Sequence, residues 1–161
     1  MNGNSNHSQD GSVSIEKLLD ELGFILHPIK GISMLPMLDQ NRDNVYIVAV
    51  KGDERGKLKK HDIPLYRRPN GQYVLHRILA VKKDHYIIRG DNLVTLEYIP
   101  FDWILGKTEN YYKDGKECDL QNSEYLAYVK KITRFWRIKA LYYRARRFVG
   151  RILRRIIKKK K

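Results

Sequence analysis

Cysteines, signal-peptide features and long apolar runs are almost missing from this sequence of 161 residues. Cys118 is the only cysteine, so no disulfide can form within the chain and a disulfide-stabilised secreted scaffold is excluded. The opening stretch, MNGNSNHSQDGSVS, has neither the basic start nor the apolar centre of a signal peptide. No run approaches the ~18 apolar residues of a membrane-spanning helix. We therefore expect a protein of a reducing compartment that does not cross a bilayer by itself.

Metal-ligand clusters and glycine-rich phosphate loops are missing as well. His27, His61 and His85 have no cysteine or histidine partner at the spacing of a structural zinc site. Neither of the common glycine-rich loops that hold phosphates occurs in the chain. We expect no metal ion and no cofactor, which removes metalloenzymes and nucleotide-dependent enzymes from consideration.

Acidic residues are nearly absent from the last quarter of the chain. Residues 1–120 contain 17 Lys and Arg and 17 Asp and Glu, whereas residues 121–161 contain 15 Lys and Arg against Glu124 alone. The whole net charge of +14 therefore lies after residue 120. Such an uneven distribution bears on the partners of a protein and not on its fold.

The length suits one domain with appendages. We expect a polar disordered tail over 1–12, a β-rich domain over 13–120 and a basic helical extension over 121–161. Ser14 precedes an apolar spacing that ends at Gly23, which predicts a short helix. β-branched and aromatic runs then predict strands, two of which, 64–68 and 73–81, are joined by the hairpin signal RPNG. The predicted fold class is mainly β, with a short N-terminal helix and a basic amphipathic C-terminal helix.

Three polar residues stand in apolar surroundings. Ser33 lies within GISMLPML, His76 interrupts YVLHRILAV, and Asp91 follows the glycine of IIRGDN. A serine becomes nucleophilic when a neighbouring base takes its proton, and an imidazole base works best when a third group fixes its tautomer. Each residue alone also has a structural interpretation: a turn hydroxyl, a hydrogen-bonded core histidine and a turn aspartate. The composition permits a Ser-His-Asp unit, and sequence order alone leaves both interpretations open.

The order of these segments resembles that of the signal peptidase I-like serine peptidases, which share a β-rich catalytic fold with the LexA-type self-cleaving repressors. The matching stretches lie roughly within residues 28–112 and are, in order, GISMLPML, RDNVYIV, LKKHDIPLYRRPNGQYVLHRILAV, YIIRGDN and WILGK. The resemblance implies that Ser33 is the nucleophile and that His76 is the general base, as in the histidine-type members of the family. It also implies that Asp91 orients or supports the site.

The chain departs from the family pattern at two positions of the site. Gly31 stands where a serine often helps to form the oxyanion hole, which leaves backbone N–H groups as donors, and the loss of one such donor typically raises the barrier by ~3 to 4 kcal/mol. The second aspartate expected after GDN in histidine-type enzymes is missing, and Glu97 is the possible substitute. The substrate and oxyanion region implied by the resemblance comprises Gly31, Met34 and Pro36.

The basic C-terminal segment has apolar residues at intervals near three and four from Tyr125 onward, which predicts one amphipathic helix, or two that are broken near Gly150. Such a segment can bind an anionic membrane surface, pack on the β domain or a protein partner, or bind nucleic acid. The residues expected to contact a membrane or a polyanion are Arg134, Trp136, Arg137, Arg144, Arg146, Arg147, Arg151, Arg154 and Arg155.

These observations lead to one functional hypothesis and one alternative. The hypothesis is a serine endopeptidase that cleaves a leader or signal-type peptide, bound in extended form as an added strand. It would act in the cytoplasm or at the cytoplasmic face of the membrane, with a peptide or preprotein substrate and an anionic membrane surface as partners. The alternative is an inactive module with the peptidase fold that binds peptides or nucleic acid.

Overall fold

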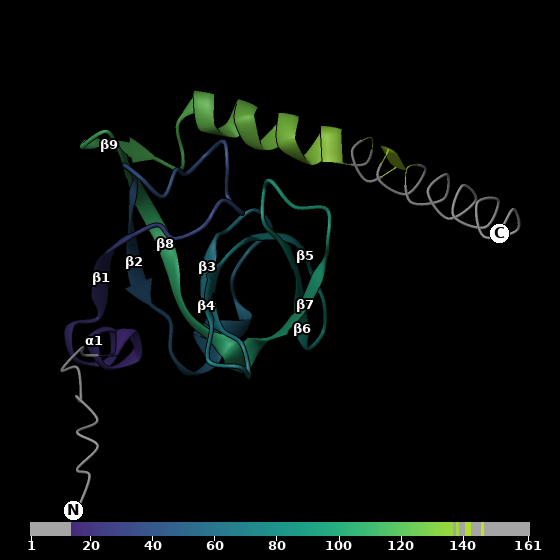
Figure 1. The fold of residues 1–161 in the computed structure, drawn as a ribbon. Coiled ribbons are helices and arrows are strands. Elements are labelled where there is room, and N and C mark those ends of the chain that lie inside the picture. The colour runs from purple at the N-terminus through teal and green to yellow at the C-terminus, as the bar shows by residue number, and fades with distance from the viewer. Residues whose placement is uncertain (1–13, 137, 139–140, 143–145, 147–161) are drawn as a thin grey trace, which may run out of the picture.

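The computed structural model describes residues 14–136, 138, 141–142 and 146 (Figure 1). The predicted polar tail over 1–12 lies outside the described residues, as does the predicted break near Gly150. Six arginines of the predicted contact surface also lie outside them: Arg137, Arg144, Arg147, Arg151, Arg154 and Arg155. The described part is mainly β, with a short helix before the strands and a second helix after them, as predicted.

The first helix, α1 (Ile15–Leu22), begins and ends where the sequence predicts. The Ser14 side chain accepts a hydrogen bond from the Lys17 backbone N–H, which satisfies one of the donors that the start of a helix leaves free. Gly23 ends the helix with a φ of 80°, a left-handed conformation that costs glycine least. Leu19 is 2% exposed and packs into the core beneath the helix.

The described strands form two antiparallel sheets (Figure 1). The strands of the larger sheet are β1 (Phe24–Pro28), β2 (Asn44–Ala49), β3 (Pro64–Arg67), β4 (Tyr73–Leu75), β8 (Ile104–Lys113) and β9 (Lys116–Asp119). Their order is β1-β2-β8-β3-β4, with β9 paired to β8. The smaller sheet has the order β5-β6-β7 and consists of β5 (Arg77–Val81), β6 (His85–Arg89) and β7 (Glu97–Pro100). Two short 3-10 helices, η1 (Gly52–Gly56) and η2 (Phe101–Trp103), lie in the connections.

One predicted strand is divided between the two sheets. The sequence predicts a continuous strand over 73–81, but β4 ends at Leu75 and β5 begins at Arg77. β4 pairs with β3 through the predicted hairpin, whereas β5 pairs with β6. The chain therefore passes from one sheet to the other at His76, which lies at their junction.

Two hydrophobic clusters fill the domain. One is shared by α1, the larger sheet and the C-terminal helix. The other is centred on the smaller sheet, with Ile78, Tyr86 and Ile88 fully buried. The loop that contains GISMLPML contributes three buried residues to the first cluster: Met34, Met37 and Leu38. The apolar character of this loop therefore anchors the segment that carries Ser33.

The second helix covers residues 123–136, and residues 138, 141, 142 and 146 are also helical. Its first turns pack on the β domain, because Tyr125 is 6% exposed, Val129 is 2% exposed, and both belong to the first hydrophobic cluster. Residues on both sides of the predicted boundary at residue 120 therefore belong to one hydrophobic cluster. No helix in the described part of the chain is long and apolar enough to span a membrane.

Candidate active site

Ser33 lies in the loop between β1 and β2, and it is partly buried. Asn92 fixes this loop by two hydrogen bonds: its backbone N–H donates to the Ser33 carbonyl over 2.8 Å, and its Nδ2 donates to the Ile32 carbonyl over 3.2 Å. The Ser33 hydroxyl itself makes no hydrogen bond to another described residue. The serine is therefore held through its backbone, which leaves the hydroxyl available.

His76 approaches Ser33 across Gly90. A Cβ atom at Gly90 would lie 2.7 Å from the Ser33 carbonyl oxygen and 2.9 Å from His76 Nε2. Both atoms are thus within 3.0 Å of one point, and only a residue without a side chain fits between them. Within the part of the chain that the structure describes, no hydrogen bond joins the Ser33 hydroxyl to His76. The structure brings the two predicted residues to the same place without closing the contact between them.

Glu97 holds the other side of the imidazole. Its Oε1 lies 3.0 Å from His76 Nδ1, and Tyr66 Oη lies 3.2 Å from the same nitrogen. Arg68 fixes the carboxylate in turn, because Nε donates to Glu97 Oε2 over 2.9 Å and Nη2 donates to the same oxygen over 2.7 Å. Each carboxylate oxygen therefore has its own partner, and the carboxylate cannot rotate without losing one of them.

The Glu97 contact bears on which imidazole nitrogen carries the proton, since the Tyr66 hydroxyl can either donate to Nδ1 or accept from it. A carboxylate only accepts hydrogen bonds, so a hydrogen bond between Glu97 and His76 requires the proton on Nδ1. In a neutral imidazole, a proton on Nδ1 leaves a lone pair on Nε2. Nε2 is the nitrogen beside Gly90 and the Ser33 loop. The arrangement can therefore present a base to the serine.

Burial keeps this imidazole neutral. His76 is 2% exposed, and burial lowers the pKa of His76 below its ordinary value of 6.5. Glu97 acts in the opposite direction by favouring the charged ring, and Arg68 lowers the pKa further. The proton is thus released more readily than in water, and the neutral form dominates at pH 7.

Asp91, predicted to support His76, has other partners. Its Oδ1 and Oδ2 accept hydrogen bonds from Arg77 Nε and Nη2 over 2.9 and 2.7 Å, and both side chains are fully buried. Tyr128 Oη donates to Oδ2 over 2.9 Å. No hydrogen bond links Asp91 to His76 in the described chain. Glu97, considered in the sequence as a substitute acid, takes the position beside the imidazole.

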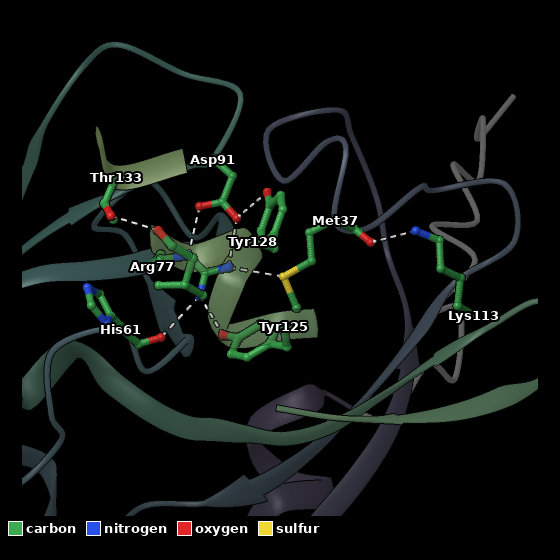
Figure 2. A network of polar contacts seen from close by, with 9 residues as sticks. Met37, His61, Arg77, Asp91, Lys113, Tyr125, Tyr128 and Thr133 are labelled. Carbon is green, nitrogen blue, oxygen red and sulfur yellow. Dashed lines mark hydrogen bonds and ion pairs between the residues drawn. The ribbon is translucent and has the colours of Figure 1, made fainter. Parts of the chain in front are cut away.

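Arg77 joins four segments of the chain (Figure 2). Its hydrogen-bond acceptors are the His61 carbonyl, Tyr125 Oη, the Asp91 carboxylate and Met37 Sδ. Burial alone lowers the pKa of Arg77, but Asp91 and Tyr125 more than offset this effect and keep the guanidinium charged. Because Arg77 follows His76 and Met37 belongs to the Ser33 loop, the network ties together the two segments that carry the candidate residues.

A second buried arginine has an aromatic partner. Arg89 is 1% exposed, and its guanidinium lies over the Trp136 ring, 4.8 Å from the centroid. Arg89 Nε and Nη1 have no hydrogen-bond partner among the described residues. Burial lowers the pKa of Arg89 to about 10, although Asp91 acts in the opposite direction. The Arg89–Trp136 contact attaches the C-terminal helix to the smaller sheet, and it places the predicted contact residue Trp136 against the domain.

The other residues of the predicted substrate region surround Ser33. Gly31 has a φ of 83°, and its N–H donates to Gln40 Oε1 over 2.7 Å, so this donor is already engaged. Met34 is buried and Pro36 is exposed. The backbone N–H groups of Ser33 and Met34 donate to no other described residue. These two groups are the available donors next to the hydroxyl.

The site around Ser33 and His76 is not distinguished by a cluster of metal ligands or by a pronounced surface hollow among the described residues. The described residues contain no group of three His, Cys, Asp or Glu that could hold a metal ion. A surface hollow of about 280 Å³ lies elsewhere, lined among others by Leu19, Arg55 and Leu105. Neither Ser33 nor His76 borders this hollow. The chemistry of the side chains, and not the size of a cavity, identifies the candidate site.

Sequence reasoning missed the two arginines that fix the site. The sequence does contain a signal for the role of Arg77. An arginine inside the apolar run LHRILAV is expected to be buried, and a buried guanidinium needs an anionic partner. The sequence contains no such signal for Arg68, since RRPNG is typical of an exposed turn. Its role depends on the position of β7, which carries Glu97, and the sequence alone does not predict that β7 lies beside Arg68.

Comparison with known proteins assigns no function to this chain. No protein-family model matches the chain, and neither a curated protein nor a solved structure matches it. The function is therefore inferred from the geometry around Ser33 and His76 and from the resemblance of the sequence.

Proposed function

We propose that this chain is a serine endopeptidase of the signal peptidase I-like type, which cleaves a leader or signal-type peptide. One observation carries the proposal: His76 Nε2 lies beside Gly90 and the Ser33 loop, while Nδ1 lies 3.0 Å from the Glu97 carboxylate that Arg68 holds. A structural histidine would need neither this orientation nor a glycine between its ring and a serine. The order of the sequence motifs supports the same assignment.

The reaction follows from the positions of these atoms. Ser33 Oγ bonds to the carbonyl carbon of the scissile peptide while its proton passes to His76 Nε2. Glu97 stabilises the resulting imidazolium through the Nδ1–H. The negative carbonyl oxygen accepts hydrogen bonds from the N–H groups of Ser33 and Met34. The C–N bond then breaks as His76 returns the proton to the leaving amine, and water hydrolyses the acyl-enzyme with His76 again as the base.

The serine side chain must turn toward Nε2 before this step. Ser33 has one side-chain torsion before the hydroxyl, and its staggered rotamers differ little in energy. Catalytic hydrogen bonds are often long in the free enzyme and tighten when substrate binds. We therefore expect a bound peptide to close the contact between Ser33 and His76.

An extended peptide has a route to the site along the edge of the larger sheet. β4 is the last strand in the order of that sheet, pairs with β3 on one side, and is followed directly by His76. A strand edge offers unpaired backbone groups to which a peptide can add. A peptide paired with β4 would carry its carbonyl groups toward His76.

A serine-directed fluorophosphonate probe tests the proposal without knowledge of the substrate. The wild-type protein should be labelled at Ser33, as located by mass spectrometry of the peptide that contains it, and Ser33→Ala should not be labelled. Ser123→Ala, which makes the same change at an exposed helical position, should be labelled like the wild type. Equal labelling of the wild type and Ser33→Ala would refute the nucleophile.

The alternative is a peptide-binding module without turnover. It is favoured by the missing hydrogen bond between the Ser33 hydroxyl and His76. A wild-type protein that resists the probe at every concentration, yet binds extended peptides, would be such a module.

A further inference from the structure

The C-terminal helix has two apolar faces, of which only one is used by the domain. The inner face contacts the domain, because Val129 is 2% exposed and the partly buried Trp136 lies against the Arg89 guanidinium. The outer face carries large apolar residues that are more than half exposed: Phe135 at 53%, Ile138 at 62% and Leu141 at 69%. Figure 1 shows the helix as a rod along one side of the β domain, beginning near β9.

Helical spacing separates these faces. Val129 and Trp136 are seven residues apart and therefore lie on one side of the helix, toward the domain. Phe135, Ile138 and Leu141 follow one another at intervals of three, which places them along one stripe. Ile138 is two residues beyond Trp136, so it points to nearly the opposite side. The outer stripe is thus an exposed apolar surface that does not belong to the core.

Positive charge lies on the same side of the helix as the stripe, since Lys131 and Arg134 are seven and four residues before Ile138. Lys130, Lys131 and Arg134 are exposed on the same helix, and no ion pair in the described chain involves them. Arg146, further along the helix, is exposed as well. The segment 121–161 carries 15 Lys and Arg against one Glu. A partner of this surface must therefore be both anionic and able to take up large apolar side chains.

We propose that the outer face of this helix docks on the surface of an anionic phospholipid bilayer, with Phe135, Ile138 and Leu141 inserted among the acyl chains. Such a bilayer satisfies both requirements at one surface: headgroups attract the lysines and arginines, and the region below them accepts the apolar stripe. A nucleic acid backbone matches only the charge, because it offers no medium for exposed isoleucine and leucine. The helix would lie in the plane of the membrane and hold the β domain beside it through Tyr128 and Trp136.

Co-sedimentation of the full chain with vesicles tests this docking. The wild type should bind vesicles that contain phosphatidylglycerol and should bind pure phosphatidylcholine much more weakly, with binding reduced by added salt. Ile138→Ser combined with Leu141→Ser should weaken binding by about tenfold or more, because two apolar side chains no longer insert. Changing Lys130, Lys131 and Arg134 to glutamine should weaken it by about fivefold per charge.

A matched control makes the same chemical change elsewhere. Leu22→Ser combined with Leu26→Ser removes two side chains that are 59% and 58% exposed, on α1 and β1, and should bind vesicles like the wild type. Circular dichroism should give all variants the same folded spectrum. Ser33→Ala should also bind like the wild type, so that failure of the peptidase proposal and failure of the docking proposal can be told apart.

Three outcomes would overturn the docking. One is equal binding of the wild type to charged and uncharged vesicles, or no binding to either. The second is undiminished binding by the variant with Ile138→Ser and Leu141→Ser. The third is salt-sensitive binding to a homopolymer RNA that persists in this variant while vesicles are not bound, which would identify a nucleic-acid surface instead.

Discussion

Replacement of Glu97 by glutamine should switch the tautomer of His76 and leave the fold intact. Arg68 donates two hydrogen bonds to Glu97 Oε2, and a guanidinium cannot accept one. The amide oxygen of the glutamine must therefore occupy the Oε2 position, which turns its NH₂ group toward His76 Nδ1. An NH₂ group only donates, so Nδ1 becomes the acceptor and the imidazole proton moves to Nε2. There it blocks transfer of the Ser33 proton.

The expected loss of activity is large. In serine peptidases, the wrong histidine tautomer lowers kcat by about 10⁴-fold, equivalent to about 5.5 kcal/mol in the barrier. The Glu97 side chain is 20% exposed, so water can compete for part of this effect. We therefore expect Glu97→Gln to react with the fluorophosphonate probe about 10³ to 10⁴ times more slowly than the wild type. The free energy of unfolding should change by only about 1 kcal/mol, since Arg68 keeps its acceptor.

Two measurements check the reasoning separately. The rate of probe labelling at Ser33 reports reactivity, and ¹⁵N NMR of the His76 ring reports the tautomer directly. A second substitution provides a rescue: Arg68→Met in the Glu97→Gln background removes the constraint on the amide, so that its oxygen can turn toward Nδ1. The double variant should label faster than Glu97→Gln alone. A wild-type tautomer in Glu97→Gln, or a double variant slower than the single one, would refute the role assigned to Glu97 and Arg68.

The buried ionisable groups lead to four more expectations. Probe labelling should rise with pH as His76 loses its proton, with a midpoint below 6.5 because burial lowers the pKa of His76, and a midpoint above 6.5 would contradict this assignment. Since the unfolded chain binds this proton more readily, His76 should also reduce the free energy of unfolding as the pH falls below 6.5. Arg77→Met should destabilise the fold by about 3 to 5 kcal/mol in urea unfolding, because Asp91 is left buried without its partner. Arg89→Met, which deprives no carboxylate of an ion pair, should cost about 2 kcal/mol or less, and equal costs for the two variants would show that the Arg77–Asp91 pair is not what holds the fold.

Local signals explain which parts of the fold could be predicted. The bounds of α1 follow from a serine cap and a glycine end, and the β3–β4 hairpin follows from its turn residues. The division of 73–81 at His76 could not be predicted in this way, because it depends on which strand each half pairs with. β7 and β9 have four residues each, and they are defined by their neighbours in space more than by their own residues.

The C-terminal helix shows the limit of charge and periodicity as guides. Both features predict a basic amphipathic helix after residue 120, and the structure has a helix over 123–136. They do not reveal that Tyr125 and Tyr128 reach the Arg77–Asp91 pair, because a tyrosine on an amphipathic helix suits a core and a membrane surface equally well. Whether the face of such a helix is occupied by its own domain depends on tertiary packing.

The alternation of side chains along an extended chain explains why Glu97, and not Asp91, contacts the imidazole. His76 and Arg77 are consecutive residues, so their side chains leave the backbone in opposite directions. One direction leads to Glu97 and Arg68, and the other leads to Asp91. Asp91 therefore pairs with the residue that follows the histidine, and Glu97 contacts the imidazole itself. A loss of activity after substitution of Asp91 would act through Arg77 and the Ser33 loop, and only a measurement on the His76 ring can distinguish this indirect effect from a direct one.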